Sequence, residues 1–291
     1  MSWLGLVRQN PTLRLALARS LALKHQRARR LRRSAEQALD RLAQLCREDV
    51  TLFVPEFEAR FALSPASALF HRILIDGEYE PQLVQAFRHH LDPQRDVLDI
   101  GANVGFFTVL AARLAVSGRV LAAEPSRTAA GRLRHNLALN AVSEKVILFE
   151  GLLSDRAGER TLNVIPGREE YSSIGPLVHP SVAGEAFVQE IAPATTVDSL
   201  VERHRLKPGL LKLDVEGAEA LVLAGATRTL REHRPVILSE LSNALLRTMG
   251  TSGTQVVAQL QELGYSVTDL KDPTLRPGVR LYGDILAVPR G

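Results

Sequence analysis

One stretch of the sequence decides the fold: VLDIGANVGFFT, residues 97–108. Its apolar start is typical of a buried strand, and a helical pattern begins at its end, with two glycines between them. Because Gly101 and Gly105 carry no Cβ, a ligand can approach the backbone closely there, and the helix start presents unpaired N–H groups. Asp99 and Asn103 add side chains that suit an ammonium and a carboxylate. The turn therefore predicts a site for a ligand with an amino-acid head, the alternative being a purely structural glycine turn.

The spacing of the glycines argues against two common nucleotide sites. Gly-x-x-x-Gly differs from the Gly-x-Gly-x-x-Gly of dinucleotide-binding turns, and no Lys-Ser/Thr pair follows it as in a phosphate-binding P-loop. A nicotinamide-dependent oxidoreductase, the rival enzyme class, is disfavoured for this reason. A catalytically silent binding protein is the non-enzymatic rival, and the intact acidic and glycine positions count against a decayed site.

Strands and helices alternate on both sides of this turn. Such alternation indicates βαβ units and an α/β fold with a doubly wound, mostly parallel sheet. The last two strands have no helix between them and are expected to form an antiparallel hairpin at one edge of a seven-stranded sheet. We expect strands over 96–100, 119–123, 146–149, 210–213, 235–238, 265–270 and 284–288, and helices over 80–91, 104–115, 126–139, 218–232 and 255–263.

Three segments are expected to depart from this alternation. Residues 161–165 read as an extra strand, and residues 167–193 as a long loop. The segment that contains Pro55, Pro65 and Asp76-Gly77 is expected to be an irregular connector.

Ligands of such sheets bind beyond the carboxyl ends of the strands. Glu124 ends the second strand, 23 residues after Gly101, where an acidic residue accepts hydrogen bonds from both ribose hydroxyls, and Pro125 follows it. After the third strand, Leu152 occupies the place of an adenine and either packs on that ring or belongs to the core.

A second charged stretch, KLDVEGAE at residues 212–219, spans the end of the fourth strand. Strand alternation puts Lys212, Asp214 and Glu216 on one side, which is costly unless they face a polar site or pair with one another. Asp214 and Glu216 are candidates for a general base, an acceptor-orienting group or metal ligands, and Glu240 at the end of the fifth strand would complete a carboxylate cluster. The alternative is a salt-bridged structural role.

Together these stretches resemble the FkbM family of methyltransferases. The flanking TTVDSL at 195–200, VLAGA at 222–226 and GEYE at 77–80 fit the same family, and the resemblance covers about residues 75–245. It implies a class I, Rossmann-like methyltransferase fold and S-adenosylmethionine as methyl donor. It also implies an acceptor hydroxyl on a sugar, glycan, glycolipid or other polyhydroxylated natural product, and it adds Tyr79 to the expected cofactor site.

The loop YSSIGPLVHP, residues 171–180, lies where such folds elaborate an acceptor pocket. His179 is a candidate to take the acceptor's proton, because a free imidazole has a pKa near 6.5. A solvated loop histidine is the alternative.

The amino-terminal segment differs in charge from the rest of the chain. Residues 1–50 hold eleven Lys and Arg against four Asp and Glu, which gives this segment a net charge of +7. Because the whole chain carries +4, the remaining residues carry 4 − 7 = −3 and are slightly acidic. We expect a basic helical extension over 1–54, helical over 12–48, ahead of a methyltransferase domain over 55–291. It is expected to pack on the domain or on a second subunit. Contact with an anionic membrane surface is the less favoured alternative, and nucleic acid is not expected because no aromatic residues interleave with the arginines.

Other features favour a cytoplasmic protein. The single Cys46 cannot form an intramolecular disulfide, no stretch reaches the roughly 18 apolar residues of a membrane span, and the start lacks the pattern of a signal peptide.

Overall fold

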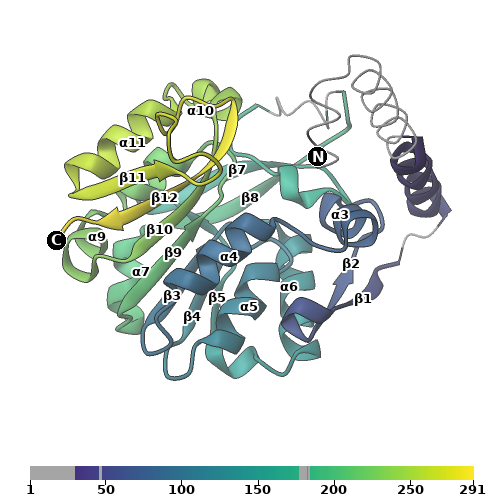
Figure 1. The fold of residues 1–291 in the computed structure, drawn as a ribbon, viewed down its shortest axis with the longest axis horizontal. Helices are drawn as coiled ribbons and strands as arrows, with labels where there is room; N and C mark the ends of the chain where they lie inside the picture. The colour runs from purple at the N-terminus through teal and green to yellow at the C-terminus, as the bar shows by residue number, and fades with distance from the viewer. Residues whose placement is uncertain (1–29, 46–47, 177–181, 183) are drawn as a thin grey trace, which may run out of the picture.

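The structure is a computed structural model that describes residues 30–45, 48–176, 182 and 184–291. A seven-stranded sheet forms its centre, in the order β11-β12-β10-β9-β3-β4-β5 (Figure 1). The five strands from β10 to β5 are parallel, whereas β12 is antiparallel to both β10 and β11. The expected doubly wound sheet with an antiparallel edge hairpin is therefore confirmed. Its strands are β3 (Asp96–Ile100), β4 (Val120–Ala123), β5 (Val146–Phe149), β9 (Pro208–Leu213), β10 (Val236–Ser242), β11 (Tyr265–Asp269) and β12 (Tyr282–Pro289).

Helices cover both faces of this sheet. Because successive strand residues point to opposite faces, Val97 of β3 joins one hydrophobic core and Leu98 joins the other. The first core packs under α4 (Pro81–His90), α5 (Phe106–Leu114) and α6 (Arg127–Leu139). The second packs under α7 (Val197–His204), α8 (Glu219–Ala224), α9 (Thr227–His233), α10 (Asn243–Thr248) and α11 (Gly253–Glu262).

The helix expected over 218–232 is two helices, α8 and α9. Between them lies Gly225, where a Cβ would stand 2.0 Å from the backbone oxygen of Ser154. The backbone at Ser154 passes so close to Gly225 that the helix breaks there, and the sequence alone does not reveal this contact.

A second sheet lies beside the carboxyl ends of the central strands. It has the order β6-β8-β7, formed by β6 (Leu152–Leu153), β7 (Gly158–Val164) and β8 (Val188–Thr195). The extra strand expected at 161–165 is present as part of β7. The expectation of a loop throughout 167–193 was wrong, because its last residues belong to β8, and a short 3-10 helix, η3 (Glu169–Tyr171), lies near its start.

The segment expected as an irregular connector is ordered instead. It forms the hairpin of β1 (Val50–Val54) and β2 (Ala59–Leu63), joined by η1 (Pro55–Phe57), and then α3 (Ala68–Asp76). Phe57 and Phe61 are buried against Phe106 of α5, with ring centroids 4.7 and 5.3 Å apart, so the hairpin is part of the first core. The expected domain boundary after residue 54 falls inside this hairpin.

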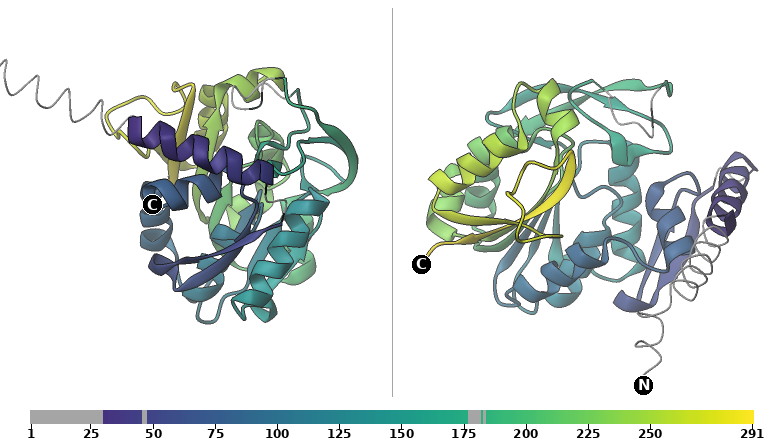
Figure 2. Two further views of the ribbon diagram at one scale, coloured as in Figure 1. Left: turned by 90° about the vertical axis from the view of Figure 1, so that its right-hand side faces the viewer. Right: turned by 45° about the horizontal axis from the view of Figure 1, so that its top comes forward.

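A helix over residues 30–45 precedes the hairpin and lies beside α3 (Figure 2). Arg32 donates two hydrogen bonds to the carboxylate of Asp76, at 2.7 and 3.1 Å, and Leu39 packs on the first core. The first 29 residues of the expected extension lie outside the described residues. None of the helices in the described part of the chain is long and apolar enough to cross a membrane.

Candidate active site

A cavity of about 210 Å³ opens at the carboxyl ends of the central strands. The strand order reverses there, since β4 lies on one side of β3 and β9 on the other, and this is where such sheets bind ligands. The structure brings most of the sequence-predicted residues to its walls. They are Tyr79, Gly101, Asn103, Glu124, Pro125, Leu152, Asp214, Glu216 and Glu240.

Three predicted residues are not among those that line the cavity. Asp99 and Gly105 lie outside its wall, and His179 lies outside the described residues.

The glycine turn serves packing first. A Cβ at Gly101 would stand 1.7 Å from the backbone oxygen of Asp214, and one at Gly105 would stand 3.1 Å from Cγ of Leu133. Both glycines also have positive φ angles, +79° and +88°, which side chains rarely adopt. Gly105 therefore packs on α6, whereas Gly101 lines the cavity and lies close to the backbone that follows β9. That both glycines clear space for a ligand stays a prediction.

Asp99 is fully buried below the cavity rather than facing it. Thr108 donates a 2.5 Å hydrogen bond from its hydroxyl to one carboxylate oxygen, and the ammonium of Lys212 lies 3.8 Å from the other. Asp99 and Lys212 are register partners on β3 and β9. Burial raises the pKa of Asp99, and Lys212 and Thr108 oppose that shift. In this structure Asp99 contacts Thr108 and Lys212, and its contact with a ligand ammonium stays a prediction.

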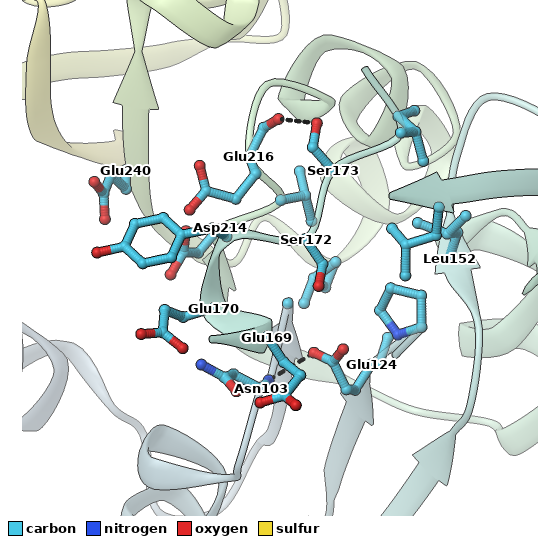
Figure 3. A pocket seen from close by; sticks show the side chains of 18 of the residues that line it. Asn103, Glu124, Leu152, Glu169, Glu170, Ser172, Ser173, Asp214, Glu216 and Glu240 are labelled. Carbon is cyan, nitrogen blue, oxygen red and sulfur yellow. Dashed lines mark hydrogen bonds between the residues drawn. The ribbon is translucent and has the colours of Figure 1, made fainter. Parts of the chain in front are cut away.

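Glu124 lies at one end of the cavity, directly after β4 (Figure 3). Its two carboxylate oxygens accept backbone N–H groups, from Asn103 at 2.8 Å and from Ser126 at 2.9 Å. Burial raises the pKa of this carboxyl to about 7, although both hydrogen bonds oppose the shift. Each oxygen has a further lone pair, so the carboxylate can accept two hydroxyl groups of a ligand.

The other end of the cavity is acidic. Figure 3 shows Asp214, Glu216 and Glu240 gathered across the cavity from Glu124 and Leu152. The ammonium of Lys212 donates to Asp214 at 3.1 Å, and the pKa of this lysine is raised because neighbouring carboxylates outweigh its burial. The expected alignment of Lys212, Asp214 and Glu216 thus includes a real ion pair.

Glu216 has the most unusual backbone in this cluster. Its φ of +51° turns the chain after Asp214, and the hydroxyl of Ser173 donates to its backbone oxygen at 3.2 Å. Burial raises the pKa of the Glu216 carboxyl well above its usual range, and Asp214 and Glu240 add to the effect. Burial and Asp214 likewise raise the pKa of Glu240 to about 9. Each of these carboxyls therefore binds a proton more tightly than an ordinary carboxylate and is a stronger base once ionised.

Sequence reasoning missed part of the lining. Glu80 and Glu170 both contribute carboxyl groups, and burial raises the pKa of Glu80 to about 7. Glu170 accepts the backbone N–H of Ala68 at 2.8 Å, while Glu169 accepts Arg132 of α6 at 2.7 Å, so η3 is tied to two helices over the cavity. The signals were present as charged residues in GEYE and in the segment before Tyr171, but no spacing rule links them to the strand ends.

Metal ligation was one role expected for Asp214, Glu216 and Glu240. Within the described residues, no three His, Cys, Asp or Glu side chains form a group that could hold a metal ion.

Comparisons with known proteins place the chain among methyltransferases. The family model of the Methyltransferase FkbM domain matches residues 99–267. Methyltransferase sdnD of Sordaria araneosa is 30% identical over 200 residues, which span 59% of this chain and 74% of the relative. The 31-O-demethyl-FK506 methyltransferase FkbM of Streptomyces tacrolimicus is 27% identical over 236 residues, covering 72% and 85%. A solved structure, methyltransferase FkbM of Methylobacillus flagellatus KT, shares 15% identity with a TM-score of 0.46, covering 87% of this chain and 58% of that one.

Proposed function

The chain belongs to the FkbM family of methyltransferases, and from this premise we propose that it methylates a hydroxyl group of a sugar, a glycan or glycolipid, or another polyhydroxylated natural product. Family membership confirms two expectations from the sequence, the class I Rossmann-like fold and S-adenosylmethionine as the methyl donor.

The residues at the Glu124 end of the cavity fit this donor. Glu124 can accept the two ribose hydroxyls, since both of its oxygens keep a lone pair after binding Asn103 and Ser126. Leu152 and Pro125 supply apolar wall for the adenine, and the glycine turn with Asn103 supplies polar groups for the amino-acid head. Bound S-adenosylmethionine supplies an electrophilic methyl group on a sulfonium.

The observation that carries the acceptor class is the set of carboxyl groups at the opposite end. A hydroxyl oxygen becomes a good nucleophile only as its proton leaves, so a base within reach is needed. Glu216 has a strongly raised pKa and faces the cavity, whereas Asp214 is engaged by Lys212. We assign Glu216 as the general base and Asp214 and Glu240 as groups that orient the acceptor.

In the reaction, the acceptor oxygen attacks the methyl carbon as the carbon–sulfur bond breaks. Sulfur keeps the electron pair, and the hydroxyl proton passes to the carboxylate of Glu216. The enzyme's main contribution is to align the three atoms at near-attack distance. The name of the Streptomyces relative, which describes an O-demethyl acceptor, supports oxygen as the acceptor atom.

The test is methyl transfer from isotopically labelled S-adenosylmethionine to pools of sugars, polyketides and amines. Label in methyl ethers supports the proposal, and label only in amines refutes it. Absence of turnover, with S-adenosylhomocysteine still bound, would favour the silent binding protein; binding of NAD in its place would favour the oxidoreductase. Activity that survives thorough dialysis against EDTA is the expected result and separates a direct base from a metal.

A further inference from the structure

The acidic end of the cavity is not closed. It continues into an open groove of about 1010 Å³, because Arg72, Glu80, Glu240 and Tyr282 line both hollows. An acceptor whose reacting hydroxyl reaches Glu216 therefore has a way out of the enclosed cavity along the surface.

The walls of this groove come from separate parts of the chain. The end of α3 contributes Asp76, the first turn of α4 contributes Gln82, and β12 contributes Asp284, with Lys271 beside it. Arg32 of the helix over 30–45 forms the far wall and is held there by its two hydrogen bonds to Asp76. The left view of Figure 2 shows this helix lying across the region of α3.

The charges in the groove are balanced in pairs. Arg32 lies 2.7 Å from Asp76, Arg72 lies 3.7 Å from Glu80, and Lys271 lies 3.7 Å from Asp284. Glu78 and Glu240 add further carboxyl groups. A polyanion would meet cations that are already neutralised together with an excess of acids, so the groove does not suit a phosphate-rich or nucleic-acid chain.

The groove instead offers many hydrogen-bonding groups and more polar than apolar surface. Ile75, Pro81 and Leu83 are its larger aliphatic residues, and Leu83 is buried. Neutral hydroxyl groups can donate to the carboxylates and accept from the guanidinium and ammonium groups. These features match an uncharged, polyhydroxylated chain better than an acyl or polyketide chain.

Building on the proposed function, we propose that the groove binds the part of the acceptor beyond the methylated unit. The preferred acceptor is then an uncharged chain of several hydroxylated rings, of the oligosaccharide class, with one end in the cavity and the rest between β12, α4 and Arg32.

The first experiment measures acceptor length. The full chain is incubated with labelled S-adenosylmethionine and a partial acid hydrolysate of mixed neutral polysaccharides, and the products are separated by ring number. We expect kcat/KM at least about tenfold higher for fragments of three or more rings than for single rings. Equal labelling of single rings overturns the inference but leaves the proposed function standing, as does label that appears only in a parallel polyketide extract. Label in no hydroxyl compound defeats both.

The second experiment uses a pair of matched variants on one helix. Gln82 and Gln85 are both exposed on α4, but only Gln82 lines the groove. Gln82→Trp should lower kcat/KM for the long acceptor about tenfold while leaving the short acceptor and the Kd of S-adenosylhomocysteine unchanged. Gln85→Trp should change none of the three. An unaltered ratio of long to short acceptor in Gln82→Trp would overturn the groove assignment.

Discussion

Glu124 accepts the backbone N–H of Asn103 at 2.8 Å, and this bond ties the end of β4 to the glycine turn after β3. Asn103 has a positive φ of +49°, so the turn that presents it is held in a conformation that most residues avoid. The carboxylate thus braces the turn, and in the proposed function it also receives the ribose of the donor.

Replacing this carboxylate should weaken donor binding. Glu124→Ala removes two hydrogen bonds to the ribose, which should cost roughly 1.5–3 kcal/mol, or about 10- to 150-fold in the Kd of S-adenosylhomocysteine. Isothermal titration calorimetry measures the change. Glu144 is exposed and lies outside the cavity, so the variant Glu144→Gln serves as the control. Equal affinity in wild type and Glu124→Ala would remove the ribose assignment.

Donor affinity should also depend on pH. Burial raises the pKa of Glu124 to about 7, so its carboxyl gains a proton as the pH falls through 7 and then loses acceptor capacity. The affinity for S-adenosylhomocysteine should be constant above about pH 8. Well below pH 7 it should decrease, and the limiting decrease is about tenfold for each pH unit. Glu80 and Glu219 also have pKa values of about 7, so the control is essential. Glu124→Gln should flatten the profile; a profile unchanged in that variant assigns the titration to another carboxyl.

The base should be visible in turnover rather than in binding. Glu216→Gln should lower kcat at least about 100-fold, the scale of a lost general base, with little change in the Kd of S-adenosylhomocysteine. Asp214→Asn should also lower kcat, because it releases Lys212 from its 3.1 Å partner beside the acceptor. In wild type kcat should fall as the pH drops through the raised pKa of Glu216, since only the ionised form accepts a proton. Normal turnover by both variants would make His179 the leading candidate.

The sequence predicts the central sheet well because each signal there is local. Apolar runs define β3, β4 and β9, and Ser126 caps α6 as expected, accepting the backbone N–H of Ala129. The carboxyl ends of parallel strands meet at one edge, so the sequence alone predicts that Glu124, Asp214 and Glu240 lie at a single cavity.

The misses occur where a distant partner decides. The ion pair of Asp99 could not be predicted, because its partner Lys212 lies 113 positions later and is placed beside it by the β3–β9 register. β8 was hidden by Pro193 and by exposed Val188 and Ile191, since proline usually argues against a paired strand. The lining by Glu80, Glu169 and Glu170 depends on where α3, α4 and η3 fold over the strand ends, which no local pattern encodes.

The buried pair below the cavity should matter for stability. Lys212 is 5% exposed and lies 3.8 Å from the fully buried Asp99. Lys212→Met keeps most of the side-chain volume but leaves the carboxyl without its cation, which should cost about 3–5 kcal/mol in the free energy of unfolding. Urea denaturation followed by circular dichroism measures this. The double variant Lys212→Met/Asp99→Asn should recover part of the loss. A single variant as stable as wild type would show that Asp99 is neutral in the folded protein.

The helix over 30–45 should mediate association between chains. Leu31 and Leu45 are 72% and 86% exposed, whereas Leu39 and Arg32 hold the helix to the body, so its outer leucines lack a cover within the described residues. The helix also mixes charge signs, as one packed against protein does. Deleting residues 1–48 spares β1, which begins at Val50, and the Arg132–Asp49 ion pair. We expect the truncated chain to bind S-adenosylhomocysteine normally. Light scattering should show a smaller oligomer, because the exposed leucines of the helix are then absent, or a lower solubility, because the surface that the helix covered is then bare.

A different result would assign the segment to a membrane surface. In that case the truncated chain keeps its mass and solubility, and the full chain binds anionic vesicles at 0.15 M salt, since such attraction supplies about 1 kcal/mol per well-placed cation.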